Sequence, residues 1–346
     1  MLSGLPERLE ALPKAELHVH LDGSLRPMTL ADLARDRGVP LPSYDAGVLA
    51  RHMRVADARS LEEYLDRFVL TLSVMQDQAA LERIARELVE DHARENVRYA
   101  EIRFCPALCT RDGLGPDEVL DACLRGMEGA AETLGVHARV IVCALRTLDP
   151  AVSVEMAELA VAYRGRGVVA FDLAGPEAGY PVREHLDAFR VVRAAGLPVT
   201  VHAGEGFGAP SIREAIDLGG ASRIGHGTRL HEDPELLALV RERRIPLEVC
   251  LTSNVQTGVV RGYAGHPVRQ YMEEQIPVAL CTDNHLVSGM TLTEEYGHAV
   301  ESLALTWDGV VRVARTAFEV AFVDADLRSA LLEAFDEEVA RLGKEG

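Results

Sequence analysis

The chain has 346 residues, of which 48% are hydrophobic and 26% are charged, and its formal net charge is −18. These proportions are those of an ordinary globular protein, and the length suits two average domains or one large α/β barrel. The arginines are dispersed, so this acidic chain offers no basic stripe to a phosphate backbone, which argues against a nucleic-acid partner. No apolar run approaches the roughly 20 residues of a membrane helix and no secretory signal is visible, so we expect a cytoplasmic protein with no membrane partner.

Short strand-like runs alternate with helical patterns along the chain. Eight runs have the composition of buried strands, and they begin at Ala15, Tyr99, Arg139, Val168, Pro198, Arg223, Ile245 and Ile276. Between them the apolar spacing changes to about 3.6 residues, as in 187–196 and 234–244. This alternation predicts an α/β fold, a (β/α)8 TIM barrel formed as a single domain by residues 1–346. A doubly wound sheet would need a glycine-rich phosphate loop after the first strand, and LDGSLRP is not one.

The interval between the first and second strands is too long for one helix. Ser60 and Glu63 form a capping-box signature, and apolar residues from Leu61 to Met75 then line one helical face. A second helix, roughly 79–95, is expected to be the barrel's own. We therefore predict a helical insertion at about 30–76 over the C-terminal mouth of the barrel, where active sites of this fold lie, although extra packing is an equally good interpretation.

The lysines and cysteines limit the chemistry. The only lysines are Lys14 and Lys344, so none stands in mid-chain to form a Schiff base or, as a carbamate, to bridge two metal ions. This weakens the alternative of a binuclear metal-dependent hydrolase of esters or cyclic amides. The six cysteines lack paired spacings that would complete a zinc cage, and we expect most of them to be reduced core residues.

Polar residues stand at the ends of four predicted strands, in the motifs HVH, VHAGE, RIGHG and CTDN. The two histidines of HVH are two residues apart in a strand, so they point to the same side. Because the carboxyl ends of barrel strands meet at one mouth, we expect convergence of His18, His20, His202, Glu205, His226 and Asp283. A lone strand histidine is more often a satisfied polar residue, but clustered imidazoles with a carboxylate suit zinc or a similar divalent ion.

Several stretches together resemble the adenosine deaminase family of amidohydrolase barrels: LPKAELHVHLDGSL, VTVHAGE, IGHGTRL, CLTSN, and TDN followed by TLTEEY. They occur in that family's order, from about Leu12 to Tyr296. The resemblance implies one zinc ion (Zn²⁺) per chain and a small-molecule purine nucleoside as substrate. The implied zinc ligands are His18, His20, His202 and Asp283.

The same resemblance implies roles for the remaining residues. Glu205 corresponds to the acid that protonates N1 of the purine, and His226 to the residue that orients and deprotonates the attacking water, which Asp283 also holds. Asp22 corresponds to a contact of the ribose 5′-hydroxyl and Gly175 to a backbone contact at N3, and His20 would lie beside the substrate. A protonated Glu205 requires a raised pKa, which burial can supply.

One position departs from the family pattern. Many members have a second aspartate after the metal-binding one, at a contact with N7 of the base, whereas this chain has Asn284. An amide can donate a hydrogen bond to N7 directly, so purine recognition is retained.

The expected reaction is zinc-dependent hydrolytic deamination of adenosine or 2′-deoxyadenosine to the inosine product and ammonia. The alternative is another 6-aminopurine, such as 6-amino-6-deoxyfutalosine of menaquinone biosynthesis, or free adenine, and the sequence does not separate them. A non-catalytic purine-binding barrel would be expected to have lost Glu205, His226 or a metal ligand, and all are present. The HxE and PCxxC motifs of nucleic-acid deaminases are absent. The oligomeric state stays open.

Overall fold

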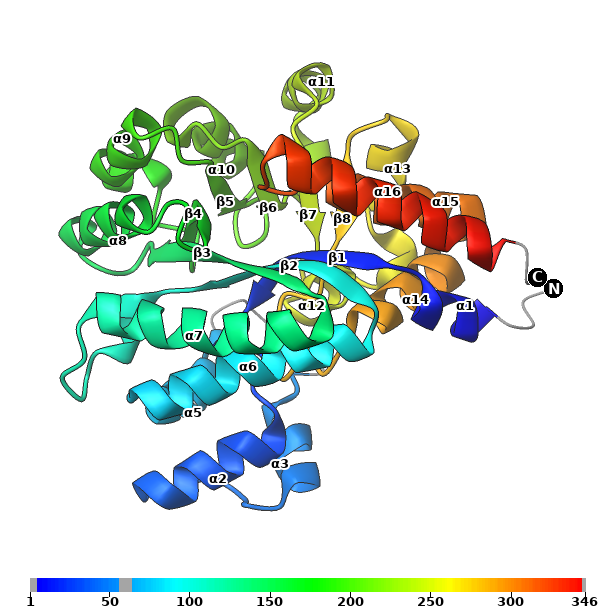
Figure 1. Cartoon of the computed structure of the whole chain (residues 1–346). Coiled ribbons are helices and arrows are strands. Elements are labelled where there is room, and N and C mark those ends of the chain that lie inside the picture. The colour runs from blue at the N-terminus through cyan, green and yellow to red at the C-terminus, as the bar shows by residue number, and fades with distance from the viewer. Residues whose placement is uncertain (1–4, 56–63, 344–346) are drawn as a thin grey trace.

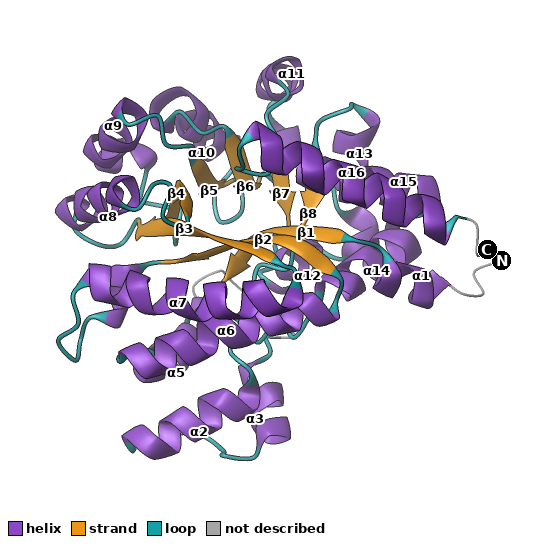
Figure 2. Cartoon of the chain, in the orientation of Figure 1, coloured by secondary structure: helices purple, strands orange, loops and turns teal. Residues whose placement is uncertain are grey.

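The computed structural model describes residues 5–55 and 64–343, with strands inside and helices outside (Figure 2). The strands are β1 Lys14–His20, β2 Val97–Phe104, β3 His137–Leu145, β4 Val168–Ala174, β5 Thr200–Ala203, β6 Arg223–His226, β7 Leu247–Val249 and β8 Val278–Leu280. The α-helices are α1 Leu5–Ala11, α2 Pro27–Arg37, α3 Ala46–Met53, α5 Phe68–Val74, α6 Gln78–Arg94, α7 Pro116–Leu134, α8 Pro150–Ala162, α9 Leu186–Ala194, α10 Ala209–Glu214, α11 Pro234–Arg243, α12 Leu251–Gln256, α13 Val268–Glu273, α14 Leu292–Leu303, α15 Trp307–Glu319 and α16 Ala325–Leu342. Short 3₁₀ or π-helical segments are Pro106–Cys109, Val182–His185, Ala215–Gly219, Leu230–Glu232 and Tyr263–Gly265.

The strands close into the predicted (β/α)8 barrel. Two parallel sheets, in the orders β1-β2-β3-β4 and β5-β6-β7-β8, meet at two seams. At the first seam Phe171 pairs with Val199, and at the second Val19 pairs with Asp283. There the Asp283 N–H donates to the His18 carbonyl at 2.8 Å, and its carbonyl accepts from the His20 N–H at 2.7 Å. Closure of the barrel therefore places Asp283 between the two histidines of β1.

Local sequence explains where the outer helices begin. Proline occupies the first turn of α7, α8 and α11, where its missing N–H costs nothing. Asp77 caps α6 by accepting from the Ala80 N–H at 2.8 Å, and Thr291 with Glu294 forms a capping box at α14. The helices predicted at 79–95, 187–196 and 234–244 are confirmed as α6, α9 and α11.

The insertion between β1 and α6 contains α2, α3 and α5. Figure 1 shows α2 and α3 below α5 and α6, away from the strands. The segment that ends in α5 lies over the mouth, because Tyr64, Leu65, Phe68, Val69 and Leu72 line the cavity there. No residue of α2 or α3 lines this cavity. The insertion thus covers the mouth as predicted, but only through its last part.

In its described part the helix expected from Leu61 to Met75 is interrupted by a turn, although Tyr64, Leu65, Phe68 and Leu72 share the side that faces the cavity. Leu61 and the capping pair Ser60 and Glu63 lie outside the described residues. After them the backbone is helical at 64–65, forms a turn at 66–67, and continues as α5. The Tyr64 hydroxyl bonds Ser288 Oγ at 2.7 Å and accepts from the Asn284 amide at 2.9 Å. These tertiary contacts fix the first part against the loop after β8, and apolar spacing carries no information about them.

All six cysteines are buried and unpaired, as expected of reduced core residues. Within 5–55 and 64–343, no helix combines the length and apolarity needed to cross a bilayer.

Candidate active site

A cavity of about 280 Å³ opens at the C-terminal mouth of the barrel. Its inner end is polar and its outer wall is apolar, the usual composition of a small-molecule site. Eight residues singled out from the sequence line it: His20, Asp22, Gly175, His202, Glu205, His226, Asp283 and Asn284. The ninth, His18, lies directly behind them, with ring centroids 4.5 Å from His202 and 4.8 Å from His226. The closed barrel brings all of the predicted site residues together.

His18 and His202 present their Nε2 atoms to the centre of the cluster because carboxylates hold their other nitrogens. His18 Nδ1 lies 2.8 Å from Glu248 Oε2, and His202 Nδ1 lies 2.9 Å from Asp172 Oδ2. A carboxylate can only accept, so each ring in its neutral form carries its proton on Nδ1 and leaves the Nε2 lone pair free. This is the arrangement of histidine ligands whose second nitrogen is fixed by an outer carboxylate.

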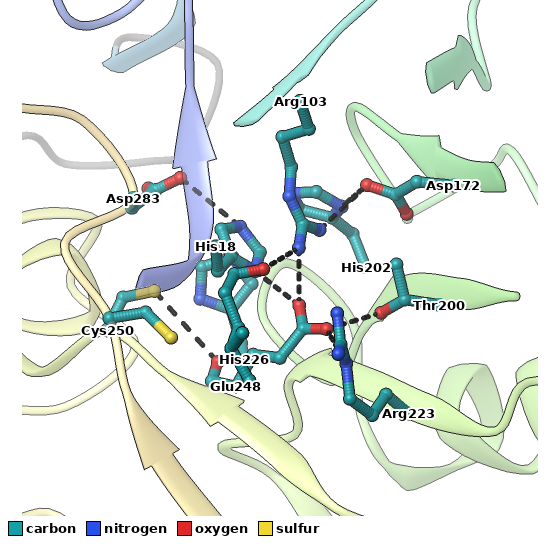
Figure 3. Close-up of polar contacts among 12 residues, drawn as sticks. His18, Arg103, Asp172, Thr200, His202, Arg223, His226, Glu248, Cys250 and Asp283 are labelled. Atoms are coloured by element: carbon teal, nitrogen blue, oxygen red, sulfur yellow. Dashed lines mark hydrogen bonds and ion pairs between the residues drawn. The ribbon is translucent and has the colours of Figure 1, made fainter. Parts of the chain in front are cut away.

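Arg103 connects these two carboxylates beneath the cluster (Figure 3). Its guanidinium donates to Asp172 Oδ2 at 2.9 Å and to Glu248 Oε2 at 2.8 Å, and all three side chains are fully buried. Arg223 donates to the other oxygen of Glu248 at 2.6 Å. Buried charges of this kind persist only when paired and hydrogen-bonded. The paired carboxylates therefore hold the two imidazoles in one orientation.

The free donor atoms converge closely enough to share a cation. Asp283 Oδ1 lies 3.4 Å from Nε2 of both His18 and His20, and His20 Nε2 lies 3.0 Å from His202 Nε2. His18 Nε2 is buried and has no partner in the described structure. Burial lowers the pKa of His20 and of His202, so both rings are neutral and each can offer a lone pair to a cation. Imidazole nitrogens with a carboxylate are the donor set of zinc and similar divalent ions, so the cluster fits such an ion.

His226 also approaches this cluster, with one atom within 4.8 Å of the donor atoms of His18, His202 and Asp283. A chain of hydrogen bonds assigns its proton. The backbone N–H of Val268 donates to His266 Nδ1 at 3.1 Å, so neutral His266 carries its proton on Nε2.

That proton is donated to Asn254 Oδ1 at 3.1 Å, which turns the amide nitrogen of Asn254 toward His226 Nδ1, also at 3.1 Å. Neutral His226 therefore carries its proton on Nε2 and has no lone pair there for a metal. Burial lowers the pKa of His226 well below its ordinary value, which keeps the ring neutral. The hydrogen-bond pattern thus separates His226 from the three other imidazoles.

Glu205 lies across from His226, with Oε2 3.5 Å from His226 Nε2. Burial, and then the nearby charges of Asp283 and Glu177, raise the pKa of Glu205 well above its ordinary value. The Glu177 carboxylate accepts the backbone N–H groups of Gly204, Glu205 and Gly206 at 2.7–2.8 Å. The loop that carries Glu205 is thereby fixed, and its carboxyl is held in the proton-bearing form.

Asp283, in contrast to Glu205, is held in its ionised form. Burial opposes its ionisation, but the closely packed imidazoles of His18, His20 and His226 hold the pKa of Asp283 below the ordinary range. Ser253 Oγ donates to Asp283 Oδ2 at 2.7 Å. Asp283 and His226 both have left-handed backbones, with φ of 63° and 62°. Such strain in non-glycine residues occurs where structure over-determines a functional position.

The remaining predicted residues lie where a bound molecule would meet them. Burial raises the pKa of Asp22 to about 7, and its Oδ1 has no partner among the described residues. Gly175 has a φ of 97°, which a side chain would strain. Asn284 donates one amide hydrogen to Tyr64 and keeps a second one.

Sequence reasoning missed the residues behind the cluster: Arg103, Asp172, Glu177, Arg223, Glu248, Ser253, Asn254 and His266. A signal for some of them was present, because YAEIRF, VVAFDL and IPLEVCL each place a charged residue inside an apolar strand. Such residues are buried only when paired. Which charges pair could not be inferred, since the partners come from strands across the barrel.

The fold and the site define a metal-dependent hydrolase barrel of the amidohydrolase type. The profile of the adenosine deaminase family matches residues 13–338, and the chain belongs to that family. It is therefore a hydrolytic deaminase acting on C–N bonds. Adenosine deaminase of Mycobacteroides abscessus is 45% identical over 339 residues, 93% of each chain.

Three solved structures share this fold. An amidohydrolase from Burkholderia ambifaria with bound Zn has a TM-score of 0.89 at 26% identity, covering 99% of this chain and 96% of its own. Adenine deaminase from Arthrobacter aurescens has a TM-score of 0.86 at 27% identity, covering 95% and 99%. N6-methyl-AMP deaminase from Arabidopsis thaliana has a TM-score of 0.85 at 30% identity, covering 96% and 98%.

Proposed function

We propose that the chain deaminates adenosine and 2′-deoxyadenosine, adding water at C6 and releasing ammonia to give the inosine product. The observation that carries the proposal is the pairing of a proton-bearing carboxyl, Glu205, with a donor cluster for one divalent ion in the same cavity. An aromatic amine leaves only after its ring nitrogen is protonated and water has added to the ring. The site contains one group for each of these tasks.

We propose zinc as the ion, held by His18, His20, His202 and Asp283. The nitrogen-rich donor set, and the bound Zn of the Burkholderia ambifaria amidohydrolase, support this choice. When bound in such a site, zinc lowers the pKa of water from about 15.7 to about 7 and so supplies a nucleophile at neutral pH.

The protein residues then act on the substrate. Glu205 donates its proton to N1 of the purine, which makes C6 electrophilic and prevents a negative charge from forming on the ring. His226 donates from Nε2 to the attacking oxygen, and ionised Asp283 accepts the proton that this oxygen loses and passes it to the amine, which leaves as ammonia. The second proton of the water restores the protonated form of Glu205. The family resemblance implied that His226 also removes a proton. Because Nε2 already carries the proton in the hydrogen-bond chain from Val268, we propose that His226 orients the nucleophile as a donor instead.

Three residues would hold the rest of the substrate. The Gly175 backbone would donate to N3, the free amide hydrogen of Asn284 to N7, and the Asp22 carboxyl would contact the ribose 5′-hydroxyl. Among the described residues that line the cavity, none is lysine or arginine. A phosphate bound there would be buried without a cation and beside Asp22, which is unfavourable. We therefore favour an uncharged nucleoside, whereas the Arabidopsis thaliana ADAL neighbours are complexes with IMP and GMP.

The second candidate is another 6-aminopurine, free adenine or 6-amino-6-deoxyfutalosine. The adenine deaminase of Arthrobacter aurescens supports it, because the two folds are similar. The Asp22 carboxyl favours adenosine and 2′-deoxyadenosine, since only a free ribose 5′-hydroxyl would satisfy its unpartnered oxygen.

Turnover of a matched panel tests the proposal. We would measure ammonia release and the absorbance change with adenosine, 2′-deoxyadenosine, 5′-deoxyadenosine, adenine, 6-amino-6-deoxyfutalosine and AMP. Adenosine and 2′-deoxyadenosine should have the highest kcat/KM. Loss of the 5′-hydroxyl should lower kcat/KM in the native protein and much less in an Asp22→Asn variant. Preference for adenine or for AMP would refute the nucleoside assignment, and no ammonia from any compound would refute the reaction.

A further inference from the structure

Away from the cavity, a second group of metal-binding side chains lies between β1, α6 and the loop after β8. Glu16, His92 and His285 each offer one ligand atom, and these atoms lie within 4.8 Å of one another. The same bound describes the cluster of His18, His202, His226 and Asp283. None of the three residues lines the cavity. The group is therefore a separate site and is not an extension of the candidate active site.

His92 is a buried histidine whose imidazole lacks the polar contacts that burial usually requires. Its side chain is fully inaccessible, and neither ring nitrogen has a hydrogen-bond partner among the described residues. The ring stands edge-on to His285, with centroids 5.1 Å apart and an interplanar angle of 84°. His285 Nε2 is likewise buried and unpartnered. Buried polar atoms are almost always satisfied, so unpartnered nitrogens that face one another indicate that something binds between them.

Glu16 supplies the oxygen ligand of the group. It is fully buried, and no lysine or arginine pairs with it in the described part of the chain. Its carboxylate accepts from the His18 N–H at 3.0 Å, from the Thr282 N–H at 3.1 Å and from Thr282 Oγ1 at 2.8 Å. A carboxylate has about four acceptor sites, so one remains for a cation.

We propose that Glu16, His92 and His285 bind a second divalent ion of the zinc type, distinct from the one proposed in the cavity. Two imidazoles and one carboxylate are a known zinc ligand set, with a water as the usual fourth ligand. His285 also lines a surface cavity of about 330 Å³, which gives the ion an access route. Since Glu16 bonds the backbone of His18 and of Thr282, this ion would fix the seam that carries His18 and Asp283.

The number of ions per chain tests the proposal independently of activity. Wild-type protein, loaded with Zn²⁺ and then dialysed against metal-free buffer, should hold two zinc ions by elemental analysis. His92→Phe, which keeps a ring in the buried space, should hold one and retain deaminase activity. His202→Ala should also hold one but lose activity, and the double variant should hold none. His137→Gln, at an exposed histidine outside both groups, should hold two.

A crystallographic measurement on the wild type covers the case in which His92→Phe does not fold. Data collected above and below the zinc absorption edge should give an anomalous peak between Glu16, His92 and His285, in addition to the peak in the cavity. A water or empty density at that position, with one zinc per chain, would overturn the proposal. Two zinc ions in His92→Phe would also overturn it. Neither result would bear on the proposed deaminase reaction.

Discussion

The two ends of the cavity are built on different principles. The floor consists of buried charged residues that hold one another: His18, Arg103, Asp172, His202 and Glu248. The outer wall is apolar and comes mostly from the insertion: Leu65, Phe68, Val69, Leu72 and Leu108. The hydrogen bonds and ion pairs of the floor are directional and allow few side-chain arrangements, whereas the apolar contacts of the wall are non-directional. The floor therefore fixes the chemistry, and the outer wall can vary with the substrate.

The structural neighbours agree with this division. Adenine deaminase and N6-methyl-AMP deaminase share the fold at TM-scores of 0.86 and 0.85, yet their names give different purine substrates. A common barrel with different substrates is expected when the reaction centre and the substrate-facing wall belong to different segments. Variants at the floor should thus change rate or metal binding, and variants at the outer wall should change KM.

The largest effect is expected at the proton donor above the floor. Glu205→Gln removes the transferable proton while keeping the shape and burial of the side chain, so kcat should fall by about two to four orders of magnitude. Metal content should stay unchanged, since Glu205 is not among the proposed ligands. In the wild type, activity should fall as pH rises through the raised pKa of Glu205, because only its protonated form can donate. Steady-state kinetics with elemental analysis measure both.

The matched control is Glu235→Gln, an exposed acid at the start of α11, which should leave kcat and the pH profile unchanged. A Glu205→Gln variant with near-normal kcat would remove the proposed acid from the mechanism.

The second effect is weaker metal binding when the floor loses a charge. Asp172→Asn keeps the shape of the side chain but removes its negative charge, so His202 Nδ1 faces a neutral and weaker acceptor. Outer partners of this kind are worth about 10- to 100-fold in metal affinity, and competition with a chelator should show a loss of that size. Asp187→Asn, at an exposed aspartate of α9, is the control and should bind metal as the wild type does. Equal affinities in the two variants would refute the role assigned to the floor.

The third effect is a change in pH dependence at the hydrogen-bond chain behind His226. In Asn254→Asp the new carboxylate can only accept a hydrogen bond, so neutral His226 must carry its proton on Nδ1 and donate it to residue 254. His226 Nε2 then has no proton to donate to the attacking oxygen. The carboxylate also raises the pKa of His226 above the low value set by burial. Below that pKa both nitrogens carry protons and the donor is present, and above it the donor is lost. We expect kcat to fall by about tenfold as pH rises through the pKa of His226 in this variant, because one hydrogen bond to the attacking oxygen is lost.

His266→Gln is the control for this chain, because its amide can still donate to Asn254 Oδ1 and should preserve the wild-type profile. If His226 instead acts as a base, Asn254→Asp should gain activity as pH rises, and kinetics from acid to alkaline pH separate the two outcomes.

The sequence predicted the barrel and the site well because both depend on local patterns. Alternation of buried strands and amphipathic helices fixed the order of elements, and strand ends in a barrel share one mouth, so His18, His202 and Asp283 could be brought together without a structure. The outer partners were not predictable in the same way. Arg103 pairs with Asp172 and Glu248 across the barrel, and no spacing in the sequence encodes which charge faces which.

Two further features depended on contacts between distant segments. The turn after Leu65 follows from the bonds of Tyr64 to residues beyond β8, against the periodicity of the helix. His92 and His285 approach each other only because α6 lies beside the seam between β1 and β8. The sequence gives no reason to pair them.

The smallest effect is expected at the outer wall. Phe68 lines the cavity beside His20, with ring centroids 6.4 Å apart, and is placed to contact the substrate. Phe68→Ala should raise KM by about two- to tenfold, because such an aromatic contact is worth about 0.5–1.5 kcal/mol. The contact does not change as the purine reacts, so kcat should stay the same. Met28→Ala in α2 is the control, since Met28 is 62% exposed, does not line the cavity and should change neither constant. A fall in kcat at unchanged KM would mean that the outer wall also acts on the reaction, and the division between floor and wall would fail.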